Sequence, residues 1–244
     1  MTNFNWKKMD EAGVKHGSLT RYLNPRMLSY IYGKNIRNKT HIFDLNKIFD
    51  SCQKLSDHVN CLIKKKGEEL TILFLATKKQ AQEITKKHAI RCGMPYIANK
   101  WKGGFLTNFE EIKKKLKKLW WLNNFIESPD FENLAKKEQL NYKKNKAKLQ
   151  SVYEGVIKLK EKPDVVFILG LSKEKVALKE CKKMGIPVIA ICNSNCNPKP
   201  FEHIYVIPGN DENTGSIDFF AELMADTIIE SNKLNKEEEK KINA

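Results

Sequence analysis

Short apolar runs alternate along this chain with segments long enough to form helices, and this alternation restricts the possible folds more than any other feature. The apolar runs are residues 41–45, 71–76, 96–98, 165–169, 188–192 and 205–207. The helix-length segments are residues 45–64, 79–92, 173–184 and 216–231. Buried parallel strands read as continuous apolar runs, and they need crossover connections that pack on the sheet. We therefore predict an α/β fold, with a parallel sheet flanked by helices over residues 41–108 and 163–232.

Residues 109–162 interrupt this alternation because they contain no strand-like run. Two sets of residues recur there at steps of three and four, which is the spacing of a coiled-coil seam. The sets are Ile112, Leu116, Leu119, Asn123 and Ile126, followed by Tyr142, Asn145, Leu149, Val152 and Val156. Pro129 lies between them and favours a turn. We predict an antiparallel coiled-coil hairpin inserted into the sheet domain at residues 109–162.

The two ends of the chain lack the regular pattern of the middle. A short helix is predicted near residues 6–13, whereas residues 17–39 mix basic residues, aromatic residues, Pro25 and Gly33 without a clear period. We expect residues 1–40 to form this helix and an irregular basic arm. Residues 233–244 have mixed charge and few apolar side chains, so we expect a mobile tail there.

The charge of the chain indicates a polyanionic partner. Lys and Arg total 44 against 29 Asp and Glu, which gives a formal net charge of +15. The abundant Lys could instead reflect an AT-rich genome, but the placing of Arg does not follow from that. Of four arginines in the chain, Arg21, Arg26 and Arg37 lie in one short N-terminal stretch. The planar guanidinium group suits phosphate in a way that Lys does not reproduce.

The sequence offers little for catalysis or for a cofactor. The turns after the predicted strands lack the glycine-rich patterns that bring a backbone close to phosphates, and no nucleophile elbow or paired zinc-binding histidines occur. Six cysteines are scattered without a C-x-x-C pair. Cys192 and Cys196 with His203 could share a metal, but half-buried thiols are the favoured reading. No stretch of about 20 apolar residues could span a bilayer. We expect no enzyme, cofactor, metal, small-molecule substrate or membrane partner.

Five motifs then occur in a recognisable order. They are Glu11-Ala12-Gly13-Val14 with Thr20-Arg21-Tyr22, Asn24-Pro25-Arg26-Met27 and Arg37-Asn38-Lys39; Trp101 with Gly103-Gly104 and Leu106-Thr107-Asn108; Gly185-Ile186-Pro187; Asn195-Cys196-Asn197-Pro198; and Ile207-Pro208-Gly209-Asn210-Asp211. Together they resemble the family of ribosomal small-subunit protein two, across roughly residues 6–231. The resemblance implies a Rossmann-like sheet domain with a protruding coiled coil. It also implies a structural, non-catalytic component of the small ribosomal subunit that contacts ribosomal RNA and neighbouring small-subunit proteins.

Some positions depart from the family pattern, and others suggest a compartment. Gly170 and Asn193 stand where family members commonly carry aspartate, so no metal is expected at that edge of the sheet. Residues 177–181 and 195–198 look closest to plastid members. With the Lys- and Asn-rich composition and no import leader, they point to a ribosome in the chloroplast or plastid stroma. The alternatives are the bacterial cytoplasm and the mitochondrion.

The residues expected to bind RNA lie mainly in the basic arm. They are Arg21, Arg26, Arg37, Lys39, Asn24, Tyr22 and Lys34, with Lys102, Lys113 and Lys114 near the hairpin as a second group. Tyr22, Tyr30 and Tyr32 either stack on bases or pack the arm onto the domain. Two other readings stay open: a doubly wound nucleotide- or sugar-binding enzyme, and an RNA- or DNA-binding protein that acts away from ribosomes.

Overall fold

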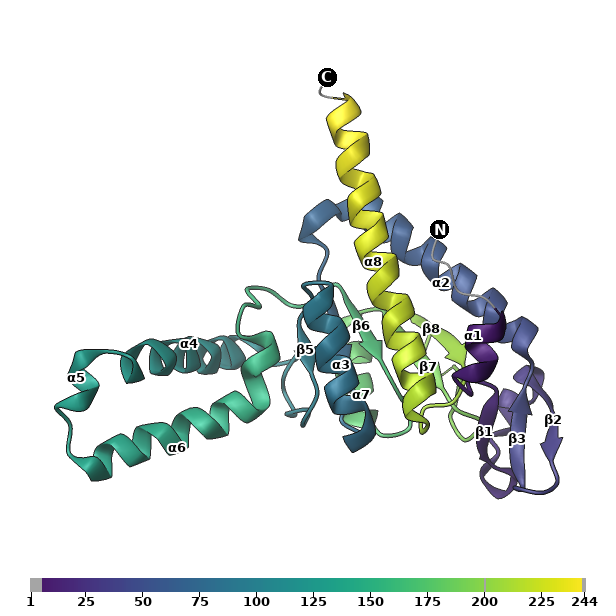
Figure 1. The fold of residues 1–244 in the computed structure, drawn as a ribbon, viewed down its shortest axis with the longest axis horizontal. Helices are drawn as coiled ribbons and strands as arrows, with labels where there is room; N and C mark the ends of the chain where they lie inside the picture. Colours follow the sequence, from purple (N-terminus) through teal and green to yellow (C-terminus); the bar gives the residue numbers. More distant parts are fainter. Residues whose placement is uncertain (1–5, 200, 243–244) are drawn as a thin grey trace.

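The computed structural model describes residues 6–199 and 201–242, so the expectations for residues 1–5 and 243–244 lie outside the described residues. Its centre is a five-stranded parallel sheet in the order β5-β4-β6-β7-β8 (Figure 1). The strands are β4 Ile72–Leu75, β5 Tyr96–Ile97, β6 Val165–Ile168, β7 Val188–Cys192 and β8 Ile204–Pro208. Every residue of β4, β6 and β7 is buried, which explains their unbroken apolar sequences. The predicted α/β class and these five strands are confirmed.

Helices cover both faces of this sheet. α3 (Lys79–Arg91) and α8 (Thr214–Ile242) pack side by side, α2 (Leu45–Lys66) lies on the other side of α8, and α7 (Lys175–Met184) lies behind the sheet in Figure 1. α2 buries Ile48, Cys52, Leu55, Val59 and Ile63, a stripe at steps of three and four. Gly185 ends α7 in the left-handed conformation that glycine adopts without strain. The core therefore lies between the sheet and these two helical layers.

The N-terminal region corrects two expectations. After α1 (Trp6–Glu11), the strands β1 (His16–Leu19), β2 (Ile31–Asn35) and β3 (Thr40–Phe43) form an antiparallel sheet in the order β1-β3-β2. Two short 3-10 helices, η1 (Thr20–Tyr22) and η2 (Pro25–Tyr30), connect β1 to β2.

The arm is thus not irregular, and the strand expected at residues 41–45 does not join the parallel sheet. Two physical reasons explain the errors. β2 alternates between half-buried and exposed residues, so its exposed face carries polar and aromatic side chains instead of an apolar run. An apolar run such as that of β3 indicates burial but does not identify the strand's partner.

A helical hairpin projects from the sheet domain (Figure 1). It consists of α4 (Phe109–Ile126), the short α5 (Pro129–Glu132) and α6 (Lys136–Tyr153), followed by η4 (Glu154–Val156). Ile112, Leu116 and Leu119 of the predicted seam are buried, but Asn145 on the other helix is exposed. The two helices contact each other, whereas coiled-coil packing stays a prediction.

The loop before the hairpin is held by Glu180 of α7. Its carboxylate accepts hydrogen bonds from Trp101 Nε1 at 3.0 Å and from the backbone N–H groups of Gly104 at 2.9 Å, Leu106 at 2.9 Å and Thr107 at 3.2 Å. Gly104 has a φ of +88°, which lets the chain turn toward α4. One buried carboxylate therefore fixes the base of the hairpin.

The last helix is longer than predicted. α8 continues to Ile242, beyond the expected end at residue 231 and into the segment expected to be a mobile tail. The sequence there is rich in Lys and Glu, which are good helix formers even where no apolar stripe marks a helix. The remaining short element, η3 (Gly67–Glu69), connects α2 to the sheet.

Candidate nucleic-acid interface

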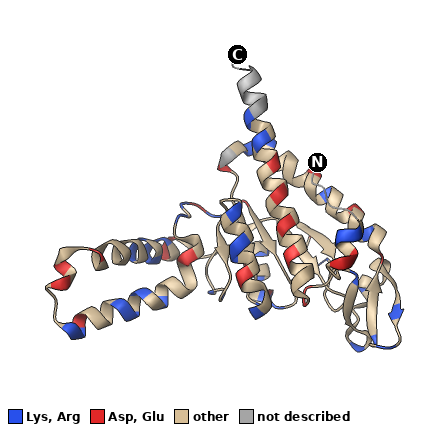
Figure 2. Cartoon of the chain, viewed as in Figure 1, with Lys and Arg blue, Asp and Glu red and all other residues tan. Residues whose placement is uncertain are grey.

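The basic arm, residues 17–39, lies within the longest stretch of the sequence that has no acidic residue. No Asp or Glu occurs between Glu11 and Asp44. The five basic residues of the arm that are expected to bind RNA are all exposed: Arg21, Arg26, Lys34, Arg37 and Lys39. Figure 2 shows basic residues and no acidic ones on the antiparallel sheet. Their charges are not compensated by acidic residues of the arm, so they are available to a polyanion.

The arm also exposes aromatic and apolar side chains among these cations. Tyr32 is 81% exposed and Ile36 is 91% exposed, and Tyr22 lies with its ring 4.6 Å from the Arg21 guanidinium carbon. Tyr30, by contrast, is half-buried and packs against the core. Of the three tyrosines weighed for stacking or packing, Tyr30 packs while Tyr22 and Tyr32 face outward. Exposed rings beside cations suit the contacts that proteins make with unpaired bases.

The tip of the β2–β3 hairpin is shaped by its own side chains. Asn35 Oδ1 accepts hydrogen bonds from the backbone N–H groups of Arg37 at 3.0 Å and Asn38 at 3.2 Å. Lys39 adopts a φ of +51°, and its carbonyl accepts a hydrogen bond from Thr20 N–H at 2.8 Å. These bonds hold Arg37 and Lys39 together at one end of the arm.

The other end of the arm is anchored to the loop that follows β7. Asn24 Oδ1 accepts a hydrogen bond from Arg26 N–H at 3.1 Å, and Asn24 N–H donates to the Ser194 carbonyl at 2.9 Å. Arg26 Nη1 donates to Asn197 Oδ1 at 3.3 Å. The structure thus brings together two motifs from opposite ends of the sequence. Ser194 and Asn197 were missed as site residues, although the motif at residues 195–198 was a signal.

The carboxyl edge of the parallel sheet is occupied by the chain itself. The strand order has the topology in which nucleotides bind beside the switch between β4 and β6. There the ammonium of the half-buried Lys78 lies 2.7 Å from Oδ2 of the buried Asp211. Asn193 Nδ2 donates to Asp211 Oδ1 at 2.8 Å, and Ser18 N–H donates to Asn193 Oδ1 at 2.8 Å. This ion pair and β1 therefore lie at the edge of the sheet where a cofactor would bind.

The second group of expected site residues lies away from the arm. Lys102 is exposed in the loop before α4, and Lys113 and Lys114 lie on α4. The Lys113 ammonium lies 3.1 Å from Glu110 Oε1, and the Lys114 ammonium lies 2.6 Å from Glu111 Oε1. The hairpin and the arm project from opposite ends of the molecule (Figure 1), so the structure does not unite these lysines with the arginines in one patch.

The residues that the structure describes include neither a membrane-spanning helix nor a metal-binding cluster. No helix within residues 6–199 and 201–242 has the length and apolar content needed to cross a membrane. Over the same ranges, no group of three or more His, Cys, Asp or Glu side chains is placed to hold a metal ion. Cys192 and Cys196 are free and buried, more deeply than the half-buried thiols that we expected.

Comparison with known proteins agrees with this architecture. The model of the family described as Ribosomal protein S2 matches residues 9–231. Two relatives from different strains of Treponema pallidum, one of them strain Nichols, are each named small ribosomal subunit protein uS2. Each is 39% identical over 225 residues, which cover 92% of this chain and 75% of the relative. The chain belongs to the ribosomal protein S2 family.

Proposed function

We propose that this chain is a structural component of the small ribosomal subunit, which binds the subunit's ribosomal RNA through the basic arm and touches neighbouring ribosomal proteins. The observation that carries this proposal is the acid-free arm, with five exposed cations and exposed Tyr22, Tyr32 and Ile36. Family membership supports the same assignment.

Within the arm, Arg21, Arg26, Arg37, Lys34 and Lys39 bind phosphates, and Tyr22 stacks on or beside a base. Asn24 acts by placing Arg26, since its side chain caps the turn that presents the guanidinium. Phosphate contacts fix orientation without reading sequence, so selectivity comes from the shape of the folded RNA. Lys102 is a secondary contact. Lys113 and Lys114 are weaker candidates than the arm, because each must leave a glutamate to reach phosphate.

A catalytic function receives no comparable support. The ion pair of Lys78 and Asp211 lies at the edge of the sheet where a cofactor would bind, and a Cβ at Gly170 would already lie 3.1 Å from Asp211 Oδ2. A nucleotide would have to displace this ion pair, which would leave the buried Asp211 carboxylate unpaired at a cost in free energy. We therefore propose a non-enzymatic role with no cofactor or small-molecule substrate.

For the compartment, we propose a plastid ribosome, with the bacterial cytoplasm and the mitochondrion as the alternatives. The support is the plastid-like sequence at residues 177–181 and 195–198 and the abundance of Lys and Asn. Fractionation of the source cells with an antibody to this chain tests the proposal. Recovery with plastid ribosomes is expected, and recovery only with ribosomes of another compartment would refute it.

The function itself is tested by incorporation into small subunits. A tagged full-length chain is expressed in cells and followed by sedimentation of the extract. The unmodified chain should sediment with small subunits, whereas the combined variant Arg21→Ala, Arg26→Ala, Arg37→Ala should remain at the top of the gradient. A charge-matched control replaces the exposed Lys175, Lys179 and Lys182 of α7 with Ala and should incorporate normally. Normal incorporation of the arginine variant would contradict the proposal.

A further inference from the structure

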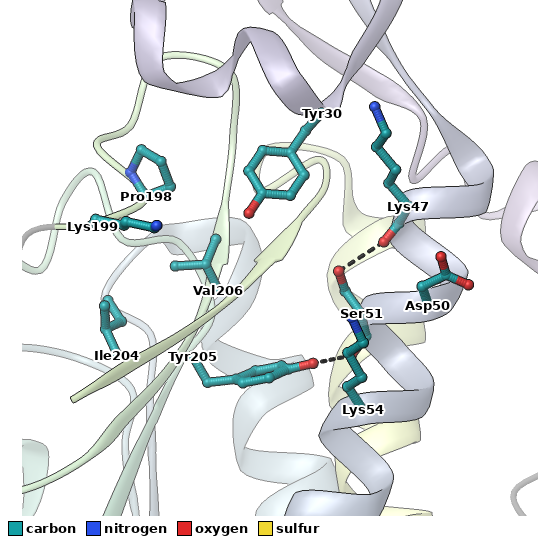
Figure 3. Close-up of a pocket in the computed structure, with 10 residues that line it drawn as sticks. All are labelled: Tyr30, Lys47, Asp50, Ser51, Lys54, Pro198, Lys199, Ile204, Tyr205 and Val206. Carbon is teal, nitrogen blue, oxygen red and sulfur yellow. Dashed lines mark hydrogen bonds between the residues drawn. The ribbon is translucent and has the colours of Figure 1, made fainter. Parts of the chain in front are cut away.

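A cavity of about 320 Å³ lies where the arm meets the sheet domain (Figure 3). It is bounded by η2, α2, β8 and residues 198–199. Its lining includes Tyr30, Lys54, Pro198, Lys199, Tyr205 and Val206. Pockets for small ligands span about 300 to 1,000 Å³, so this cavity has room for a single planar group and its substituent but not for a helix.

The cations around the cavity include two that are free to bind a ligand. Among the residues that the structure describes, the ammonium groups of Lys54 and Lys199 have no hydrogen-bond or ion-pair partner. Lys47 also borders the cavity, but its ammonium donates to the Ser29 carbonyl. Asp50 is the acidic residue in the lining and is exposed. Figure 3 shows the Lys199 ammonium directed toward the cavity and the Asp50 carboxylate directed away from it. The lining therefore favours an anionic ligand.

Two tyrosine rings provide the walls of the cavity. Tyr205 Oη donates a hydrogen bond to the Ser51 carbonyl at 2.8 Å, and its ring lies parallel to that of His58 with centroids 6.1 Å apart. The ring of Tyr205 is thus fixed before any ligand arrives. Tyr30 stands across the cavity with its hydroxyl directed inward (Figure 3). Fixed aromatic rings are the surfaces on which proteins stack unpaired bases.

The cavity is continuous with the basic arm. Asn197 Oδ1 accepts hydrogen bonds from both Arg26 Nη1 at 3.3 Å and Lys199 N–H at 3.1 Å. The Asn197 side chain therefore links Arg26 of the arm to the backbone of Lys199 at the cavity. Tyr30, the last residue of η2, belongs to the arm and also lines the cavity. An RNA strand that places a phosphate on Arg26 would continue over the opening of the cavity.

We propose that this cavity receives one unstacked nucleotide of the RNA bound by the arm, with its base between Tyr30 and Tyr205 and its phosphate at Lys54 and Lys199. The proposal rests on the proposed function and deepens it, since it assigns the arm a looped or unpaired RNA segment. An acidic peptide of a neighbouring protein would satisfy the lysines but would leave the two rings without a planar partner, so RNA is favoured.

The test uses the full-length chain, fluorescence anisotropy and three probes. The probes are a single-stranded oligouridylate, an abasic oligonucleotide of equal length and charge, and free uridine monophosphate. Two variants alter the cavity: Val206→Trp fills it, and the combined Lys54→Glu, Lys199→Glu reverses its charge. The control is Lys175→Glu with Lys179→Glu on α7, and thermal melting checks that each variant folds.

The unmodified chain should bind oligouridylate more tightly than the abasic strand by about fivefold to a hundredfold, the range measured for stacking of one base. Val206→Trp should reduce this preference to the part that Tyr22 of the arm supplies, and the double lysine variant should weaken both strands while the α7 control leaves them unchanged. Equal binding of the two strands, or a preference that Val206→Trp leaves unchanged, would overturn the proposal. So would free uridine monophosphate binding as tightly as the strand, since the cavity would then be a small-molecule site.

The arginine variant of the arm separates this proposal from the function on which it rests. It should weaken binding of both strands. If it does and the cavity variants do not, only the nucleotide site is refuted. If the arginine variant binds RNA like the unmodified chain, the proposed function fails instead.

Discussion

Among single residues, Glu180 shows how a buried carboxylate can shape a loop. Burial acts to raise its pKa, but hydrogen bonds from Trp101 Nε1 and from the backbone N–H groups of Leu106, Gly104 and Thr107 outweigh burial and lower the pKa below the ordinary value. The charged form is therefore the one that the folded chain prefers. This explains why the tryptophan and the double glycine occur together: one donates to the carboxylate, and the other lets the backbone turn around it.

Replacing Glu180 with Gln should lower the free energy of unfolding by about 1–3 kcal/mol near neutral pH, because Gln loses the charge that strengthens these bonds. A depressed folded-state pKa stabilises the fold above the unfolded carboxyl pKa of about 4.3, and this contribution disappears as the pH falls through the folded-state value. Urea unfolding at a series of pH values should show a smaller acid-side loss in Glu180→Gln than in the unmodified chain. The exposed Glu127→Gln serves as control, and identical behaviour of the two variants would contradict this account.

Individual site residues were predictable only where the sequence itself is unusual. The arginines stood out because the chain is otherwise rich in Lys. Asn197 lies in a recognised motif but was not singled out, and Lys199 did not stand out at all. Arg26 and Tyr30, beside which these two residues lie in the fold, are far away in the sequence. Glu180 was hidden for the same reason, since nothing local distinguishes it from the other glutamates of the chain.

At the level of helices and strands, buried segments were predictable and half-exposed ones were not. The strands β4, β6 and β7 read as apolar runs because both of their faces are covered. β1 and β2 each pair with β3 at the edges of the small sheet, and about half of their residues are exposed, so they do not read as apolar runs. The sequence therefore identified the parallel sheet and the two helices of the hairpin, but missed the small antiparallel sheet of the N-terminal region.

The return of the hairpin to the sheet depends on close contact between η4 and β5. A Cβ placed on Gly155 would lie 2.3 Å from the Tyr96 carbonyl oxygen and 2.6 Å from the Tyr96 ring. Gly155→Ala should therefore cost about 1–3 kcal/mol of unfolding free energy, as expected for overpacking. Gly33→Ala is the matched control, because a Cβ there meets nothing within 4 Å. Thermal or urea unfolding gives the comparison, and equal stability of the two variants would show that Tyr96 moves aside without cost.

Across the full chain, the remaining question is whether the charge acts as a diffuse field or through the arm. The net charge of +15 attracts any polyanion, but only cations that touch phosphates displace condensed counterions. A diffuse field predicts that any three cations are equivalent. The acid-free arm at one end of the molecule predicts that they are not.

The salt dependence of RNA binding decides between these views. The variant lacking Arg21, Arg26 and Arg37 and the α7 variant lacking Lys175, Lys179 and Lys182 each carry a formal net charge of +12, since each loses three of the charges that make up +15. If each arginine neutralises one phosphate, the slope of log affinity against log salt should become shallower by about 2 to 3 in the arginine variant alone. Anisotropy titrations with a fragment of small-subunit RNA over a range of salt concentrations measure both slopes. The two variants have the same net charge. Equal slopes would therefore mean that RNA affinity depends on net charge alone and that the arginines make no direct phosphate contacts.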